Sequence, residues 1–249
     1  MGQLDGRTAL VTGGTSGIGL AAAERLAGEG AHVFITGRGQ ARLDEAVASI
    51  GERVTGIRGD VARSADLDRV FEAVSRRGLG LDVLYANAGG GEFAALGQIT
   101  REHFDDAFDR NVGGTVFTVQ RLLPLLNSGA SVILAGSTSA TNAVPTFSVY
   151  AASKAAIRAF GRTWAAELGE RGIRVNTLTP GPTETPGLVG LAPDSAAAEE
   201  MLAGMAAGIP LGRVGRPAEI ANAVLFLASD QSSFMTGGEI FVDGGQAQV

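Results

Sequence analysis

The sequence has no cysteine, only two histidines and only eight prolines among its 249 residues. Without cysteine, the chain can form no disulfide, no thiolate zinc site and no cysteine nucleophile. The two histidines, His32 and His103, are too few for a multi-histidine metal site, and we expect both to be ordinary helix or strand-edge residues. No metal is expected, so any catalysis has to rely on other side chains.

The sequence also has no long apolar run and no excess of positive charge. No stretch approaches the ~20 apolar residues that cross a membrane, and residues 1–6 match neither a signal peptide nor a myristoylation site. With 20 basic and 26 acidic residues, the net charge is −6, which argues against nucleic acid or an anionic membrane as the main partner. We therefore expect a cytoplasmic protein.

The residues that are present are those of a compact chain. Hydrophobic residues make up 45% and charged residues 18%, so a sizeable core can form and disorder is disfavoured. Glycine, with 37 residues, is about twice as frequent as usual and belongs in turns and close backbone approaches to a ligand. No linker or shift in composition divides the chain, and we expect one domain over residues 1–249.

Short β-type runs alternate with helical patterns along the whole chain. The expected strands cover residues 8–12, 31–36, 53–57, 83–86, 131–135, 174–178 and 239–242. The expected helices cover residues 17–29, a segment that includes 67–74, residues 104–126, a long helix beginning near Tyr150, and residues 217–228. This alternation predicts an α/β fold, a doubly wound parallel sheet with helices on both faces.

Two segments depart from this regular pattern. The helix 104–126 holds Asn111, Gly113 and Gly114 in its interior, and because glycine there costs about 1 kcal/mol relative to alanine, we expect a local kink. Residues 180–209 contain four prolines followed by an Ala/Met-rich helix. We interpret this segment as an inserted lid.

A glycine-rich turn, Thr-Gly-Gly-Thr-Ser-Gly-Ile-Gly at residues 12–19, joins the first strand to the first helix. Unpaired amides at the helix start can bind a pyrophosphate there, and the glycines let the backbone approach it closely. A P-loop would need a lysine after Gly19, so ATP hydrolysis is disfavoured. A tight turn with no ligand is the alternative.

Tyr150 and Lys154 stand four residues apart near the start of a helix, so their side chains lie on one face. An ammonium beside a phenol lowers the phenol pKa from about 10, which favours proton transfer nearer neutral pH. Ser137 follows the strand 131–135, at the sheet edge where open α/β sheets bind ligands. Ser139 is a competing candidate, and a Tyr/Lys pair without function is the plain alternative.

Taken together, these residues resemble the classical short-chain dehydrogenase/reductase family over nearly the whole chain. The matching elements are the T-G-x-x-x-G-x-G turn at 12–19, N-A-G at 87–89, Asn111, Ser137, Y-x-x-x-K at 150–154 and Pro180-Gly181. The resemblance implies a single-domain Rossmann-type fold with a small substrate lid, and an oxidoreductase. Ala86 and Thr183 depart from the family pattern, where Asn and Ile or Val are usual.

The resemblance also implies a role for each matching residue. Tyr150 would be the general acid/base, Lys154 would lower its pKa and bind the nicotinamide ribose, Ser137 would hold the substrate oxygen, and Asn111 would anchor a water. The implied cofactor-binding residues are Gly13, Thr15, Ser16, Gly17, Ile18, Gly19, Arg38, Asp60, Val61, Asn87, Ala88, Gly89, Tyr150, Lys154, Pro180, Gly181, Thr183 and Thr185. The other tyrosine, Tyr85, lies within a strand and is expected in the core.

The end of the second strand predicts the cofactor. An NAD enzyme places a carboxylate there to bind the ribose 2′-OH, but Gly37 has no side chain and Arg38 follows it. A guanidinium matches the geometry of a 2′-phosphate. This pattern favours NADP(H), with NAD(H) as the alternative.

The favoured function is an NADPH-dependent reductase of a ketone or 3-oxoacyl-type carbonyl. Alternatives are a dehydrogenase that oxidises a secondary alcohol or sugar, a non-catalytic nucleotide sensor, and a methyltransferase with a similar turn. The partner is a small molecule, and the resemblance suggests a homotetramer with two-fold symmetry. Its expected interfaces are the helix beginning near Tyr150, the last strand, and the helix 217–228, which carries Ile220, Val224, Leu225 and Leu227. The expected substrate pocket is mainly apolar and consists of Phe93, Val144, Phe147, Leu188, Val189, Leu191, Met201 and Met205.

Overall fold

The computed structural model describes residues 2–249 and contains a seven-stranded sheet with the order β3-β2-β1-β4-β5-β6-β7. The strands are β1 (Thr8–Val11), β2 (His32–Gly37), β3 (Val54–Arg58), β4 (Leu81–Ala86), β5 (Leu126–Ala135), β6 (Arg174–Pro180) and β7 (Glu239–Val242). Every neighbouring pair is parallel. The strand order reverses between β1 and β4, which confirms the doubly wound topology and creates a crevice for ligands at the carboxyl ends of these strands.

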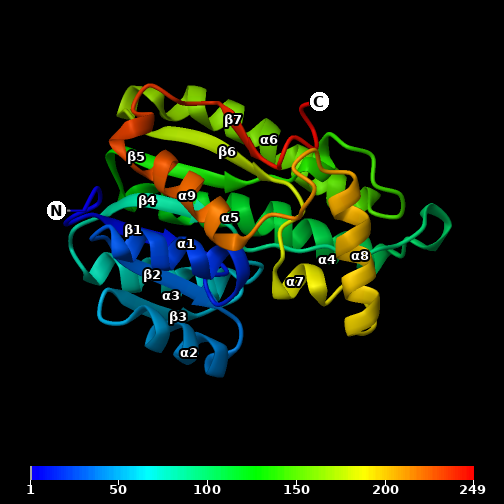
Figure 1. Ribbon diagram of the computed structural model, residues 1–249. Coiled ribbons are helices and arrows are strands. Elements are labelled where there is room, and N and C mark those ends of the chain that lie inside the picture. Colours follow the sequence, from blue (N-terminus) through cyan, green and yellow to red (C-terminus); the bar gives the residue numbers. More distant parts are fainter. Residues whose placement is uncertain (1) are drawn as a thin grey trace.

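Helices cover both faces of the sheet (Figure 1). One face carries α1 (Gly17–Gly28), α2 (Gln40–Ile50) and α9 (Pro217–Ala228), and the other carries α3 (Ser64–Arg76), α5 (Gly114–Leu122) and α6 (Ser148–Leu168). α4 (Arg101–Phe108) packs beside α6. Two further helices, α7 (Pro186–Val189) and α8 (Ser195–Ala207), lie beyond the carboxyl edge of the sheet.

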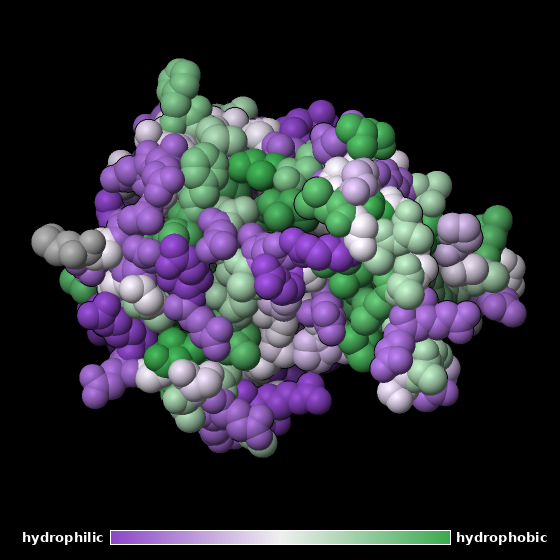
Figure 2. Space-filling view, viewed as in Figure 1, coloured by the Kyte–Doolittle hydropathy of each residue, from purple (hydrophilic) through white to green (hydrophobic). Residues whose placement is uncertain are grey.

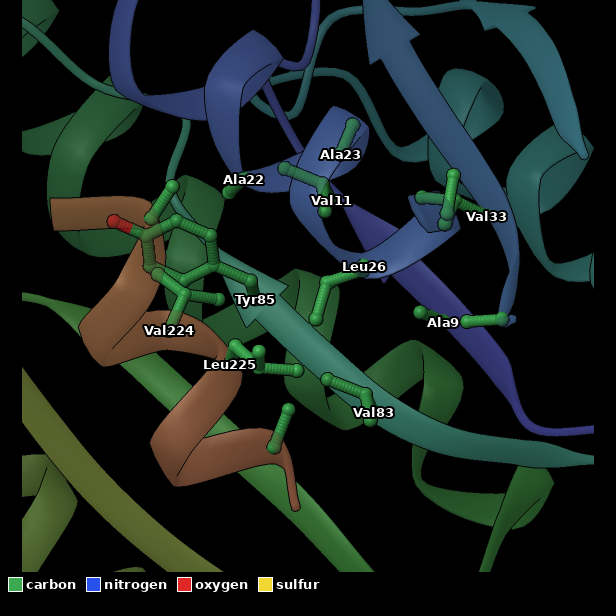
Figure 3. Close-up of a cluster of buried hydrophobic side chains, with 14 of the residues drawn as sticks. Ala9, Val11, Ala22, Ala23, Leu26, Val33, Val83, Tyr85, Val224 and Leu225 are labelled. Carbon is green, nitrogen blue, oxygen red and sulfur yellow. The ribbon is translucent and has the colours of Figure 1, made fainter. Parts of the chain in front are cut away.

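Two apolar layers hold the helices on the sheet, because successive side chains of a strand point to opposite faces. On β4, Val83 and Tyr85 contribute to the layer under α1 and α9, whereas Leu84 and Ala86 contribute to the layer under α3, α5 and α6. Figure 3 shows Tyr85 against Val224 of α9. Tyr85 is fully buried, as expected, and its hydroxyl has no hydrogen-bond partner among residues 2–249.

The predicted kink is a π-turn. α4 and α5 form one continuous helical run that is interrupted at Asp109–Gly113 by a π-helical turn. The absence of a side chain at Gly114 lets this run approach the sheet edge, since a Cβ there would lie 2.6 Å from Val61 Cγ2. The run ends in a 3-10 turn, Leu123–Leu125, and β5 begins at Leu126, earlier than the expected residue 131.

Candidate active site

The glycine-rich turn between β1 and α1 has the open geometry that an anion needs. Gly13 and Gly17 have positive φ angles of 67° and 53°, a conformation that side chains other than glycine rarely adopt. A Cβ at Gly19 would overlap the Gly13 carbonyl. Ser16 precedes α1 in extended conformation without capping it, and the first turn of α1 has no acidic residue, so the first amides of α1 are available to a phosphate.

The loop after β4 is fastened to this turn. Thr12 Oγ1 accepts hydrogen bonds from the Asn87 amide at 2.9 Å and the Ala88 amide at 3.0 Å. The Asn87 side chain donates to the Thr12 carbonyl at 3.0 Å. These bonds hold the loop against Gly13. A Cβ added to Gly13 would lie only 3.1 Å from Ala88 Cα. The two loops therefore form one rigid floor at the switch point of the sheet.

Ser137, Tyr150 and Lys154 meet at the same edge. Ser137 follows β5 after a single residue, Gly136, and its hydroxyl hydrogen-bonds with Tyr150. Lys154 is 5% exposed, lies with its Nζ 5.6 Å from the centroid of the Tyr150 ring, and donates to the Ala135 carbonyl at 2.8 Å. Ser139 instead donates its amide to Ser137 Oγ at 3.2 Å. The structure thus places Ser137, and not Ser139, against Tyr150.

Burial controls the protonation of this group. Burial raises the pKa of Tyr150 above its ordinary value, and the hydrogen bond with Ser137 opposes that rise. Burial also lowers the pKa of Lys154 from 10.5 to about 8, because an apolar surrounding disfavours the charged form. The sequence led us to expect a tyrosine pKa lowered by the ammonium, and that expectation is wrong for the protein without ligand, where loss of hydration dominates.

Asn111 lies in the π-turn and is fully buried. Its side chain accepts a hydrogen bond from the Gly90 amide at 2.9 Å and donates to the Gly90 carbonyl and to Ser153 Oγ, both at 2.9 Å. A Cβ on Gly89 would lie 2.8 Å from Asn111 Oδ1 and 3.4 Å from Lys154 Nζ. Asn111 therefore joins the loop after β4 to the helix that carries Tyr150 and Lys154.

The end of β2 has no room for a carboxylate. A Cβ on Gly37 would overlap the methyl group of Thr15. Arg38 is exposed and forms no salt bridge within residues 2–249. Arg58, at the end of β3, donates from Nε to the Arg38 carbonyl at 3.2 Å. Two arginine residues, Arg38 and Arg58, therefore lie next to each other at this end of the site.

The segment after β6 returns to the glycine-rich turn. Thr183 is buried and donates to the Gly181 carbonyl at 2.9 Å, which fixes the chain just beyond Pro180. Thr185 caps α7 by accepting the Leu188 amide at 3.1 Å, and its methyl group would lie 3.0 Å from a Cβ on Gly17. The predicted cofactor residues of β1, β2, β3, β4 and β6 thus gather at one edge of the sheet.

Two kinds of site are absent from the part of the chain that the structure describes. Residues 2–249 contain no cluster of three or more His, Cys, Asp or Glu that could hold a metal ion. Within the same residues, no helix combines the length and the apolar character that crossing a membrane requires.

Comparisons with known proteins point to one family. A family model described as "Enoyl-(Acyl carrier protein) reductase" matches residues 13–247. Oxidoreductase asL5 of Sarocladium schorii is 47% identical over 249 residues, 99% of this chain and 98% of that protein. A solved short-chain dehydrogenase/reductase of Brucella melitensis, described as a glucose/ribitol dehydrogenase, has a TM-score of 0.93 at 29% identity and full coverage of both chains, 100% each.

A curated relative carries the family name itself. Dehydrogenase/reductase SDR family member 4 of Mus musculus is 34% identical over 248 residues, 97% of this chain and 88% of that protein. The chain belongs to the short-chain dehydrogenase/reductase family. It is therefore an oxidoreductase of a family that uses NAD(P)(H), as the resemblance in the sequence implied.

Three structural features of this short-chain dehydrogenase/reductase were not foreseen. Thr12 belongs to the glycine-rich motif, but the motif does not indicate that the Thr12 hydroxyl joins two loops. The sequence does not indicate Arg58, because its position beside Arg38 depends on the register of β2 and β3, in which Gly37 pairs with Arg58. Thr146, whose φ is 64°, has no sequence signal, because threonine is not a residue that predicts positive φ.

Proposed function

We propose that this enzyme is an NADPH-dependent reductase that converts a ketone or 3-oxoacyl-type carbonyl to a secondary alcohol. The observation that carries the proposal is the convergence of Ser137, Tyr150 and Lys154 beside the glycine-rich turn. The bound nicotinamide supplies the hydride that reaches the carbonyl carbon. A solved structure described as a "putative betaketoacyl-ACP reductase", 41% identical to this chain with a TM-score of 0.87, keeps a 3-oxoacyl group among the candidates.

The three side chains divide the proton chemistry among them. The Ser137 hydroxyl donates a hydrogen bond to the substrate oxygen and holds it against Tyr150. The Tyr150 phenol gives its proton to that oxygen as negative charge develops there. The Lys154 ammonium, 5.6 Å from the ring centroid, stabilises the phenolate left behind until solvent returns a proton. Oxidation of an alcohol would use the same groups in reverse, whereas a nucleotide sensor would have no use for them.

The residues at the dinucleotide site fit NADP(H). Gly13, Gly17 and Gly19 leave space that a Cβ would fill, and the uncapped start of α1 suits a pyrophosphate. At the other end, Gly37 excludes the carboxylate that would bind a 2′-OH, and the exposed Arg38 beside Arg58 offers donors for a 2′-phosphate.

The test is NADPH consumption with a panel of carbonyl compounds, measured on the wild type and on Tyr150→Phe. The substitution should lower kcat by at least about 10³ and leave NADPH binding nearly intact, because the ring still packs but its proton is gone. Tyr85→Phe is the matched control, since Tyr85 lies in the core, and it should keep its turnover. Comparable turnover by Tyr150→Phe would contradict the assignment.

A further inference from the structure

The loops around the substrate side of the site carry no positive charge. Three segments lie there, the loop 88–99 after β4, the loop 138–149 after β5 and the lid 180–209 after β6. None of them contains lysine or arginine, and their charged residues are all acidic: Glu92, Glu184, Asp194, Glu199 and Glu200. The loop 138–149 carries no charge, and the other two segments carry only carboxylates, which would repel an anionic substrate.

The arginines that reach these loops from outside are already paired. Arg110, in the π-turn, lies near Gly90 but binds Asp106 at 2.7 Å. Beyond the lid, Arg213 and Arg216 both approach Glu219, at 2.7 and 3.5 Å. The phosphates of a coenzyme A or phosphopantetheine group need unpaired guanidinium or ammonium groups. This entrance offers none outside the dinucleotide site among residues 2–249.

An aromatic wall leads away from the proton donor. Phe147, directly before α6, lies with its ring centroid 4.5 Å from that of Tyr150 and 4.7 Å from that of Phe93. Phe93 is 42% exposed. We call Phe93, Phe147 and Tyr150 the aromatic wall. A substrate whose carbonyl oxygen contacts Ser137 and Tyr150 would lay its remaining atoms along this wall.

The loop that carries Phe147 is joined to the loop that carries Phe93, although the joint includes a strained residue. Thr146 is the only residue other than glycine with positive φ within residues 2–249, at 64°, and this conformation costs a β-branched residue about 1–2 kcal/mol. Its carbonyl accepts the Ala94 amide at 2.7 Å, which joins the two loops. Gly91 lets them close, since a Cβ there would lie 2.6 Å from Tyr150 and 2.9 Å from Phe147.

The eight residues expected to form an apolar pocket remain a prediction, but their exposure is what an entrance requires. None of them is fully buried, and Phe93, Val144 and Val189 are among the exposed large hydrophobic residues. Figure 2 shows apolar surface over α7, the first helix of the lid. The entrance therefore combines apolar surface with negative charge.

On the basis of the proposed function, we propose that the substrate is an uncharged carbonyl compound with a planar aromatic body, free in solution and not attached to a carrier. The aromatic wall selects its ring, since stacked or edge-to-face rings gain about 0.5–1.5 kcal/mol beyond burial of area. The acidic loops reject phosphate-bearing thioesters by repulsion.

The first experiment compares matched substrates with NADPH. 2-Acetylnaphthalene should exceed its saturated counterpart, 2-acetyldecalin, about 10-fold in kcat/KM. Phe93→Leu and Phe147→Leu should each reduce that ratio to about 3-fold or less, whereas Phe234→Leu, at the opposite edge of the sheet, should leave it unchanged. A ratio near one in the wild type, or a ratio that survives both wall variants, would overturn the aromatic part.

The second experiment tests charge. Ethyl acetoacetate should be at least about 100-fold better in kcat/KM than acetoacetyl-CoA, which carries the same acyl group, and added salt should narrow the difference. The double variant Glu199→Lys/Glu200→Lys should raise kcat/KM for acetoacetyl-CoA. The control variant Glu167→Lys/Glu170→Lys, near the end of α6, should leave that kcat/KM unchanged. A wild type that prefers the thioester would overturn the proposal.

A binding measurement separates this inference from the proposed function. 2-Acetylnaphthalene is titrated by calorimetry, without NADPH so that no turnover occurs, into Tyr150→Phe and into Tyr150→Phe/Phe147→Leu. The first should bind it several-fold more tightly than the second, and more tightly than 2-acetyldecalin. Equal binding would refute the aromatic wall, whereas selective binding without any turnover by the wild type would refute only the reductase.

Discussion

The buried position of Lys154 links the stability of the fold to pH. The pKa of this lysine is about 8 in the folded protein, against 10.5 for the free side chain. Below about pH 8 the lysine is protonated in both the folded and the unfolded protein, so the folded state carries the full free-energy cost of burying the charge. Between about pH 8 and pH 10.5 the folded state loses its proton first, so the free energy of unfolding should rise with pH.

Lys154→Met keeps the length of the side chain and removes its charge. The fall in pKa from 10.5 to about 8 corresponds to about 3 kcal/mol. The variant should therefore be more stable than the wild type by about 1–3 kcal/mol near neutral pH, and this gain should shrink toward pH 10. Urea denaturation at both pH values measures it. A gain that is constant with pH would show that the charge of Lys154 is not its cause.

Arg38 and Arg58 should both contribute to the preference for NADPH. Each charge-assisted contact with a 2′-phosphate is worth about 1.5–3 kcal/mol, which is roughly 10- to 150-fold in preference. The preference is measured as the ratio of kcat/KM for NADPH to kcat/KM for NADH, and as binding of each cofactor by fluorescence. Arg38→Leu should remove most of the preference, and Arg58→Leu should lower the ratio about 10-fold. Arg53→Leu, at the opposite end of β3, is the control. A wild type that prefers NADH would contradict the assignment.

The lid elements are weakly anchored. α7 has no buried residue, and α8 buries only Ala198. Thr185, which contacts the glycine-rich turn at Gly17, lies at the start of this segment. Amide hydrogen exchange of residues 186–207 should therefore be fast in the free enzyme and slower with NADP(H) bound. Exchange of α9, which packs against α1, is the internal control. Equal exchange with and without cofactor would argue against closure.

Most elements could be predicted because their patterns are local. α9 and β7 begin and end where the sequence indicated, and the other predicted strands are displaced by a few residues, with the largest extension at β5. α2 was missed, although Leu43, Ala46, Val47 and Ile50 recur at helical spacing and the first two are buried. Its first turn lacks an acidic residue and its N-cap is Gly39, so the usual start signal is weak.

The residues that could not be predicted depend on contacts between distant segments. The Thr12–Asn87 bonds and the Arg38–Arg58 contact join residues at the ends of neighbouring strands. A single sequence does not show how these strands are aligned with one another. The position of Asn111 depends on a π-turn, in which one extra residue is accommodated. Since each residue of a helix turns about 100°, this extra residue changes the direction of every side chain that follows it.

At the scale of the whole molecule, the structure changes one part of the surface expected for assembly. Ile220, Val224, Leu225 and Leu227 of α9 were expected to support an interface, but all four are buried in the core. β7, which was also expected to take part, forms the outer edge of the sheet, and all four of its residues are partly exposed.

A tetramer, as the family resemblance suggests, would use the exposed surfaces of α6 and α9 and the edge of β7, which two-fold symmetry would pair with the same surfaces of another copy. Light scattering at micromolar concentration should give four times the mass of the chain. The mass of a single chain under the same conditions would contradict it.

The burial of Lys154 has a chemical consequence, because it is the only lysine in the sequence. All other basic side chains except the two histidines are arginines, so the surface of residues 2–249 presents no primary amine from a side chain. Amine-directed labels and crosslinkers will therefore find no accessible side-chain amine within residues 2–249 of the folded enzyme. Acylation of the ε-amino group would then record each opening of the active site.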